Sequence, residues 1–549
     1  MESENHNHHE GINQLDLQNE TLAFLGLDQK GLSADDTANI LKKTTAENPL
    51  VTNCLEMDDL ASFHWDGNVL GELETNRSEA IKKGIRYRPF GEIAPYFFAS
   101  STLNVPDRKA TLAALATAQF LAENVTAKKL ETTEKLIAGT TKKSFELLCR
   151  HYALNQADTE AVFDDNATMA LYQFLGLCDL KRGDSIVGFV DMGRVMPNAL
   201  KGNNPEFVPA NFQAAVDIWQ NRASARAYVD SHDDNAGNLE ELNLEIIDHF
   251  GENGEYESDA KLIDIIIALL KEKKPKIFVM PTVTRSGRRL PTQKICAEIR
   301  ANQENVGYMP ILIIDDAQGM ARLQQKEYLH DPNGFAVADL LQHADAIFFT
   351  GAKALRALPG SSALLYKKSL TEKLDPFMDS KLRYRARRYG FYSTDASRVA
   401  DYNNAAPALA QTPELASLNA TLPDCADNAI YAHEKMTALN KKIIDELKTI
   451  SGVQIVMADN VDSFCIPDII TFSFDRPEMT DRIKKMLSNP EDYPNQTNNP
   501  IITLPAIFMD STGRSYLRIS LDCSRVHEVK YEEKIDFLLK RLREVAVSE

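Results

Sequence analysis

From about residue 86 onward, short apolar runs alternate with longer amphipathic segments, and this alternation restricts the chain to few folds. The apolar runs fall at residues 184–190, 223–229, 276–281, 310–315, 345–350 and 361–366. Segments with helical spacing lie between them, at residues 239–250, 259–272, 292–302 and 336–342. Short buried strands that alternate with helices are typical of an α/β domain with a mainly parallel sheet. In such a domain, ligands bind at the carboxyl ends of the strands.

A basic and aromatic segment at residues 381–392 separates this pattern from a different one. The rest of the chain predicts a smaller α+β domain, with helices at residues 426–450 and 531–545 and strands at residues 453–457, 469–474 and 516–521. We therefore expect a large domain at residues 86–385 and a small C-terminal domain at residues 386–549. Residues 1–85 are polar and acidic, which favours an N-terminal extension that is partly disordered.

The charge balance narrows the range of partners. With 61 Lys and Arg against 79 Asp and Glu, the chain of 549 residues carries a formal net charge of -18. An acidic surface repels nucleic-acid backbones and anionic membranes. No apolar run approaches the roughly 18 residues of a membrane span, and the amino terminus lacks the pattern of a signal peptide. We expect a cytoplasmic protein without nucleic-acid or membrane partners, although export by a signal-independent route would leave the same pattern.

The cysteines indicate reduced thiols rather than a structural framework. There are 7 of them, scattered along the chain and without a CxxC pair. This spacing argues against both a set of disulfides and a zinc cluster. We expect no metal site.

Two residues with complementary chemistry follow neighbouring apolar runs. Asp315 ends the run at residues 310–315, and Lys353 follows the run at residues 345–350. A carboxylate raises the pKa of a pyridine nitrogen, and an amine forms a Schiff base with an aldehyde, which are the two requirements of pyridoxal 5'-phosphate (PLP). Lys353 can then transfer protons as a general base once substrate displaces it.

Each of the two residues also has an ordinary interpretation. A lysine after a strand is usually a solvated side chain, and an aspartate often ends a parallel strand. The pair Asp315 and Asp316 would also suit the magnesium ion of a nucleotide hydrolase. That alternative requires a phosphate loop of the form GxxxxGK[ST], which this chain lacks.

The order of these residues, over about residues 86 to 549, resembles the class V aminotransferase and cysteine desulfurase superfamily of PLP enzymes. In that superfamily an Asp-x-x-Gln follows one strand and a Ser-x-His-Lys follows the next. Here the motifs read Asp315-Asp-Ala-Gln318 and Thr350-Gly-Ala-Lys353. The resemblance implies that Asp315 partners the pyridinium, Gln318 contacts the ring hydroxyl, Thr350 binds phosphate and Lys353 forms the Schiff base.

The same resemblance implies the architecture. It is fold type I, with a mainly parallel seven-stranded sheet in the large domain, a smaller C-terminal α+β domain and, in this chain, an N-terminal extension.

Three further positions match the superfamily. Asn166-Ala167-Thr168, before a helical stretch at residues 169–177, resembles its phosphate-binding turn, where backbone N–H groups at a helix start bind the anion. An ordinary helix cap would show the same residues. Thr284 falls where the superfamily often has an Asn that contacts the cofactor hydroxyl. Arg518 matches an Arg-x-Ser whose arginine binds the α-carboxylate of the substrate through its planar fork.

The departures concern the reaction more than the cofactor. Ala352 stands where the superfamily usually has a histidine, and the segment at residues 501–508 lacks the cysteine that desulfurases use. Neither the residue that stacks on the ring nor a cross-subunit phosphate ligand can be assigned. We expect a homodimeric PLP aminotransferase acting on an amino acid or related amine. The alternatives are a PLP-dependent lyase, decarboxylase or racemase, or a non-catalytic PLP-fold binding module.

Overall fold

The structure is a computed structural model of the chain. It describes residues 106, 108–124, 130–178, 184–189, 195–197, 207–209, 243–250, 256–302, 307–320, 340–370, 391–392, 406–456, 466, 468–476, 478–480, 482–483, 506–508, 515–522 and 531–547. The predicted extension at residues 1–85 and the predicted strand at residues 223–229 lie outside this set. Among the described helices, none is long and apolar enough to cross a membrane.

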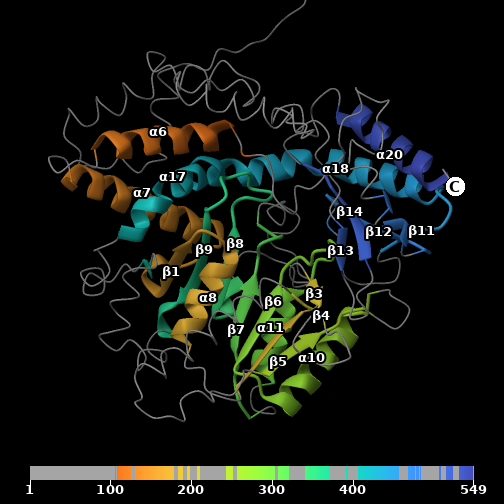
Figure 1. The fold of residues 1–549 in the computed structure, drawn as a ribbon. Coiled ribbons are helices and arrows are strands. Elements are labelled where there is room, and N and C mark those ends of the chain that lie inside the picture. The colour runs from red at the N-terminus through yellow and green to blue at the C-terminus, as the bar shows by residue number, and fades with distance from the viewer. Residues whose placement is uncertain are drawn as a thin grey trace, which may run out of the picture.

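A large mixed sheet forms the centre of the fold (Figure 1). In spatial order its strands are β10 (Phe391–Tyr392), β1 (Thr159–Asp164), β9 (Ser362–Lys367), β8 (Ala346–Thr350), β7 (Ile311–Asp315), β6 (Ile277–Pro281), β2 (Ser185–Phe189) and β5 (Asn243–Ile247). Strands β8, β7, β6, β2 and β5 run parallel to one another, whereas the pairs β8–β9, β9–β1 and β1–β10 are antiparallel. The expected mainly parallel seven-stranded sheet is confirmed, and the two-residue strand β10 adds an eighth at one edge.

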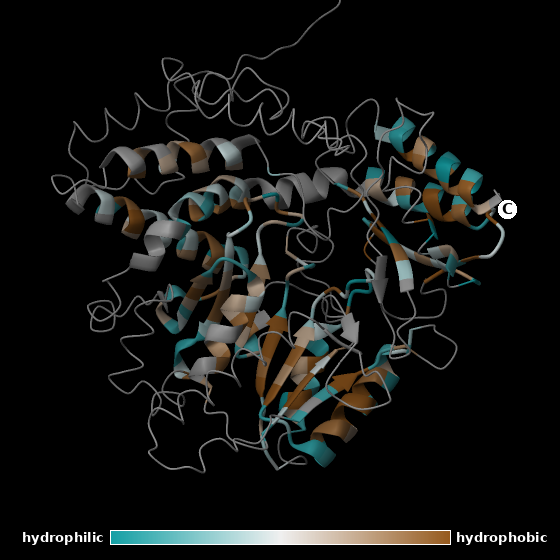
Figure 2. Ribbon diagram, viewed as in Figure 1, coloured by the Kyte–Doolittle hydropathy of each residue, from teal (hydrophilic) through white to brown (hydrophobic). Residues whose placement is uncertain are grey.

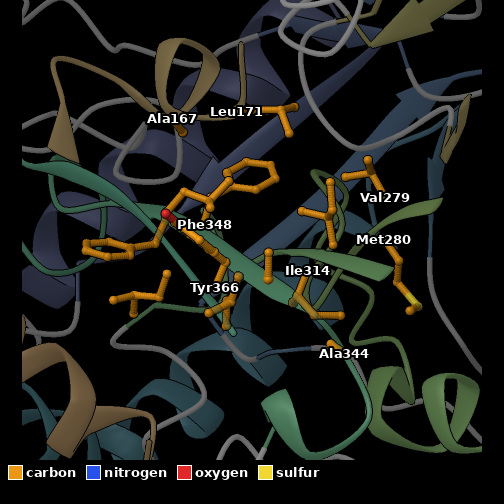
Figure 3. Packing of buried hydrophobic residues seen from close by; sticks show 14 of the residues in the cluster. Ala167, Leu171, Val279, Met280, Ile314, Ala344, Phe348 and Tyr366 are labelled. Carbon is orange, nitrogen blue, oxygen red and sulfur yellow. The ribbon is translucent and has the colours of Figure 1, made fainter. Parts of the chain in front are cut away.

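The parallel strands consist almost entirely of apolar residues because helices and loops cover both of their faces. Figure 2 shows this apolar character in the strands of the large sheet. Figure 3 shows how Met280 of β6, Ile314 of β7 and Phe348 of β8 pack in the buried core of the sheet. Continuous apolar runs therefore marked these strands correctly in the sequence.

Helices surround the sheet and form a separate layer beside it. The sheet helices are α8 (Ala167–Leu177), α10 (Asp259–Lys273) and α11 (Thr292–Ala301), and the layer contains α6 (Arg108–Asn124), α7 (Leu130–His151) and α17 (Ala406–Thr421) (Figure 1). Short 3-10 turns lie at η3 (Gln156–Asp158), η4 (Leu340–Gln342) and η6 (Leu422–Asp424). A helix was expected at residues 336–342. The part of this range that the structure describes forms the turn η4.

Helix α17 is attached to the larger core although it follows residue 385. Ser144 of α7 donates a hydrogen bond to Asn419 Oδ1 over 2.8 Å, and the Asn419 amide donates to the backbone oxygen of Thr140 over 3.1 Å. Strand β10 also follows residue 385 and pairs with β1. Both elements therefore pack with the domain expected to end at residue 385, and the core of the C-terminal unit begins within the next helix.

The C-terminal unit is an antiparallel sheet covered by two helices. The strand order is β11 (Val453–Ile455), β12 (Ile469–Phe474), β14 (Ser515–Ser520) and β13 (Ala506–Phe508), and the helices are α18 (Cys425–Leu447) and α20 (Tyr531–Val547). Leu517 and Ile519 pack in the core that these helices share, so the alternate residue Arg518 points to the opposite face of the sheet. Two short strands, β3 (Val195–Pro197) and β4 (Phe207–Pro209), pair separately.

One sequence expectation about secondary structure is wrong, and some elements were not expected. The helix predicted at residues 239–250 is instead strand β5, which pairs with β2 over its whole length. A short apolar stretch fits both the helical and the strand period, and here pairing with the sheet edge decides between them. Strand β1 was missed because it starts with polar Thr159 and Glu160, both of which are buried. Helices α6, α7 and α17 also lacked a clear pattern.

Candidate active site

The carboxyl ends of β6, β7 and β8 coincide at one edge of the large sheet. The register pairs Pro281 with Asp315 and Asp315 with Phe348. The segments that leave these three strands carry Thr284, Gln318 and Lys353, and Thr350 is the last residue of β8. Residues predicted from separate motifs are therefore brought to the same edge.

The start of helix α8 lies at this edge as well. Strand β1 is antiparallel to β9, and β9 is antiparallel to β8, so β1 and β8 run in the same direction. Helix α8 begins directly after β1 with Ala167 and Thr168, and its cap Asn166 accepts a hydrogen bond from the N–H of Met169 over 2.9 Å. The first N–H groups of a helix, here those of Ala167 and Thr168, have no partner within the helix and can bind an anion.

Asp315 and Lys353 interact electrostatically across the ends of β7 and β8. Burial raises the pKa of Asp315 to about 6, while the Lys353 ammonium and the N–H of Ala317 act in the opposite direction. That N–H donates to Asp315 Oδ1 over 2.9 Å. Asp315 is only 7% exposed. A buried carboxylate at the end of β7 is thus influenced by the charge of the amine that follows β8.

The neighbouring Asp316 has a structural role. Tyr152 donates a hydrogen bond to Asp316 Oδ2 over 2.8 Å, and Thr282 donates to Oδ1. The side chain is fully buried. Both carboxylate oxygens of Asp316 are thus occupied by protein hydroxyl groups. This arrangement disfavours the magnesium site of a nucleotide hydrolase.

The loop after β8 holds Lys353 in a compact turn. The N–H of Arg356 donates to the Lys353 oxygen over 3.0 Å, and the N–H of Ala357 donates to the Gly351 oxygen over 2.9 Å. A Cβ at Gly351 would lie 2.4 Å from Ser361 Oγ, so only glycine fits there. Arg356 has a φ of 60°, and its Nε lies 3.8 Å from Asp522 Oδ2 in the C-terminal unit.

Thr284 lies in a tight turn between β6 and α11. Its hydroxyl accepts a hydrogen bond from the N–H of Arg288 over 3.1 Å and shares one with Ser286 Oγ over 2.8 Å. Tyr256 donates to the same Ser286 Oγ over 2.6 Å. Gly287 completes the turn with a φ of 94°. A chain of hydroxyl groups therefore links Tyr256, Ser286 and Thr284.

Arg288 supports this turn from the interior. Its guanidinium is fully buried, pairs with Asp259 over 3.0 Å and donates to the backbone oxygen of Glu257 over 2.6 Å. It also lies 5.0 Å from the ring centre of Tyr256, whose ring stacks on His249 and contacts Phe250. Burial, reinforced by the charge of Arg288, lowers the pKa of His249 well below its usual value, so the imidazole is neutral. These contacts hold Tyr256 rigidly.

Arg518 reaches the site from the C-terminal sheet. Its Nη1 donates to the backbone oxygen of Arg285 over 3.0 Å, and Thr471 Oγ1 donates to that of Ser286 over 3.1 Å. The N–H of Ile466 donates to the next oxygen, that of Gly287, over 3.0 Å. Three consecutive carbonyl groups of the Thr284 turn thus bind the C-terminal unit, which places Arg518 beside Thr284.

The remaining predicted residue, Gln318, is buried in the turn that follows β7. Sequence reasoning missed Tyr152, Tyr256 and Ser286. Each is remote in sequence from the motif it supports, and no local pattern distinguishes it from an ordinary core residue.

The three cysteines whose side chains the structure describes are unsuited to nucleophilic chemistry. They are Cys149, Cys178 and Cys296, and all three are buried. Burial raises the pKa of Cys149 and of Cys296 to about 12, so both are neutral thiols near pH 7.

Comparisons with known proteins identify the fold. No protein-family model and no curated protein matches the chain. Among solved structures, mouse CSAD matches with a TM-score of 0.54 at 14% identity, covering 94% of this chain and 99% of that one. C-DES, solved with glycine covalently linked to its PLP cofactor, matches with a TM-score of 0.52 at 16% identity, covering 82% and 96%. The cysteine desulfurase CsdA of Escherichia coli matches with a TM-score of 0.50 at 14% identity, covering 82% and 94%.

This chain has their fold. The fold class expected from the motifs is therefore confirmed. At these identities the likeness defines the architecture, and the cofactor and reaction rest on the residues of the site.

Proposed function

We propose that this chain is a PLP-dependent enzyme that acts on an amino acid or a related amine, with aminotransfer as its reaction. The observation that carries the proposal is the buried Asp315, whose carboxylate interacts with the Lys353 ammonium across adjacent strand ends. PLP bound at this edge would supply an electron-withdrawing ring to the substrate's α-carbon.

The environment of Asp315 suits a cationic ring nitrogen. Burial makes the isolated carboxylate costly, which is why its pKa is raised to about 6. A positive charge placed beside it would favour the ionised form and in turn keep the ring nitrogen protonated. Lys353 supplies the amine for the cofactor aldehyde and, when released, moves protons at the α-carbon.

The hydroxyl chain is compatible with a donor role for Thr284. A threonine hydroxyl has one hydrogen and two lone pairs. Thr284 accepts from the N–H of Arg288 and shares a hydrogen bond with Ser286, in which either hydroxyl can be the donor. When Ser286, which accepts from Tyr256, is the donor, both lone pairs of Thr284 are in use and its hydrogen is available to a ligand. A donor in this place suits the ring hydroxyl of PLP in its ionised form, next to Gln318.

The two ends of the bound molecule have separate binding groups. Thr168, Thr350 and the N–H groups at the start of α8 would bind the phosphate. Arg518 would bind the substrate carboxylate, because a guanidinium pairs with it through two parallel hydrogen bonds. The bond from Arg518 to the Arg285 oxygen fixes the guanidinium relative to the Thr284 turn.

Aminotransfer is the preferred reaction because it needs only these groups. A lyase, decarboxylase or racemase would need a further group with a defined role in proton or carboxylate handling. We also propose a homodimer, from the superfamily resemblance, and a cytoplasmic location, from the sequence pattern. Light scattering of the purified protein and localisation in cells would test them.

Borohydride trapping tests the proposal directly. Purified protein is incubated with PLP, reduced and digested, and the labelled peptide is located by mass spectrometry. We expect a visible absorbance band before reduction and a phosphopyridoxyl label on Lys353 after it. The Lys353→Ala variant should lose both the absorbance band and the label. The Lys368→Ala variant, changed directly after strand β9, should keep both. A wild-type protein without a label on Lys353 would refute the proposal.

The reaction is tested by a screen of amino acids and amines with a keto acid as acceptor. Conversion of the bound cofactor to pyridoxamine phosphate, with a new keto acid in solution, indicates aminotransfer. Release of ammonia or carbon dioxide instead would indicate one of the alternative reactions.

A further inference from the structure

Ser362, the first residue of β9, has a buried hydroxyl group that none of the described contacts of the fold uses. Its side chain is fully buried, and within the described structure its Oγ has no hydrogen-bond partner. A buried hydroxyl without a partner costs free energy, and native proteins keep few of them. Such a group at a ligand-binding edge is therefore a candidate ligand contact.

The register places Ser362 in the row of residues at the proposed phosphate site. Ser362 is directly opposite Thr350 of β8 on one side and opposite Asp164 of β1 on the other. Directly opposed residues of antiparallel strands have side chains on the same face. Ser362 and Thr350 are thus neighbours on one face, at the edge where the carboxyl end of β8 lies.

The start of helix α8 lies over this same row. The rings of Phe174 in α8 and Tyr366 in β9 are in contact, with centroids 5.4 Å apart. Ser362 lies four residues before Tyr366, which is roughly 13 Å along a strand. Ala167 lies seven residues before Phe174, which is roughly 10 Å along a helix. Both steps lead back to the carboxyl edge of the sheet, so the first turn of α8 lies above Ser362.

The contact between the helix and this face of the sheet can be followed in the core. Figure 3 shows Ala167 and Leu171 of α8 beside Phe348, which is opposite Leu364 of β9 on the same face as Ser362.

From this geometry we propose that Ser362 donates a hydrogen bond to the phosphate of the cofactor, as a third side-chain ligand beside Thr168 and Thr350. The inference rests on the proposed function and extends it to a residue outside the recognised motifs. Asp164 is the competing acceptor, but Asp164 Oδ1 accepts from the N–H of Asp165 over 2.7 Å. A hydroxyl that donates to a phosphate oxygen forms a charge-assisted hydrogen bond, which is stronger than one between neutral groups.

The test compares two ligands that differ in the phosphate alone. PLP and pyridoxal are titrated separately into the full-length apoprotein by following the visible absorbance. For Ser362→Ala we expect at least a tenfold loss of PLP affinity and an unchanged affinity for pyridoxal.

Ser473→Ala is the matched control. Ser473 in β12 is also a buried serine whose Oγ has no hydrogen-bond partner in the described structure, but it belongs to the C-terminal sheet. The Ser473→Ala variant should bind PLP and pyridoxal like the wild type. In both variants, Ser362→Ala and Ser473→Ala, the thermal midpoint of the apoprotein should be unchanged or raised.

The outcomes separate this inference from the proposed function. Wild-type protein that forms no adduct at Lys353 would overturn the proposed function. A wild type that binds PLP together with a Ser362→Ala variant that binds it equally well would overturn the role of Ser362 alone. Equal losses for PLP and pyridoxal would also overturn it, because they would show an effect on the fold rather than on the phosphate.

Discussion

Arg518 donates a hydrogen bond from Nη1 to the backbone oxygen of Arg285 over 3.0 Å, although 233 residues separate them in the chain. The acceptor belongs to the turn that carries Thr284, and the donor belongs to the C-terminal sheet. The two ends of the proposed site, the cofactor ring and the substrate carboxylate, are therefore positioned by one contact. A change at this turn should affect both.

Replacing Arg518 by lysine should weaken the binding of carboxylate substrates. Lysine keeps the charge but loses the planar fork, so we expect a loss of about 1.5 to 3 kcal/mol for the carboxylate. The measurement is KM for the amino acid found in the screen and for the amine that lacks its carboxylate. Arg543→Lys on helix α20, where the arginine side chain is 45% exposed, is the surface control. A similar rise in KM for both compounds would contradict the assigned role.

Gly287→Ala should separate the turn from the C-terminal sheet. The added Cβ would lie 3.0 Å from the Ile469 side chain and backbone oxygen, at a φ of 94°. Gly307 has a similar φ of 71° but nothing within 4 Å of its Cβ position, so Gly307→Ala reports the backbone strain alone. We expect the Gly287 variant to lose on the order of 1 to 3 kcal/mol more in free energy of unfolding, measured in urea. Equal losses of unfolding free energy in the two variants would mean that the close contact between the turn and Ile469 does not contribute to stability.

Tyr256→Phe removes the hydroxyl that donates to Ser286 and leaves the ring in its stack with His249. The variant should lose about 1 kcal/mol of unfolding free energy and bind PLP more weakly, because the hydroxyl chain that orients Thr284 is broken. Tyr308→Phe is the matched control, since the buried Tyr308 hydroxyl has no hydrogen-bond partner in the described structure. Loss of PLP affinity in Tyr308→Phe but not in Tyr256→Phe would contradict the role of the Tyr256 hydroxyl in orienting Thr284.

Asp315 should make the stability of the apoprotein depend on pH. Its pKa is raised from 3.8 to about 6 in the folded protein, so the fold favours the neutral carboxyl. That contribution is complete below about pH 4 and is lost as the pH rises through about 6. Asp315→Asn mimics the neutral form, and its unfolding free energy near pH 8 should exceed that of the wild type by about 2 to 3 kcal/mol.

The gain in the Asp315→Asn apoprotein should shrink as the pH falls, and it should be accompanied by weaker PLP binding. Urea titrations between pH 4 and pH 8 measure it, with the exposed Asp445→Asn as control. A constant difference across this range would show that Asp315 does not titrate as its burial requires.

The sequence by itself determined the class of fold and the order of the chemical groups. Strands buried on both faces must be apolar throughout, so the runs that end at Asp315 and precede Lys353 could be recognised without a structure. The position of these residues after their strands then followed, because parallel strands end at a common edge.

Tertiary structure decided what local patterns could not. The stretch at Asn243–Ile247 became a strand because the edge of β2 was available for pairing. The pKa of Asp315 depends on burial and on Lys353, and the orientation of Thr284 depends on Tyr256 and Ser286. The position of Ser362 under helix α8 also depends on tertiary structure, because β9 pairs antiparallel with β8 on one side and with β1 on the other. Each of these features arises from contacts between segments far apart in the chain, and short-range periodicity carries no information about such contacts.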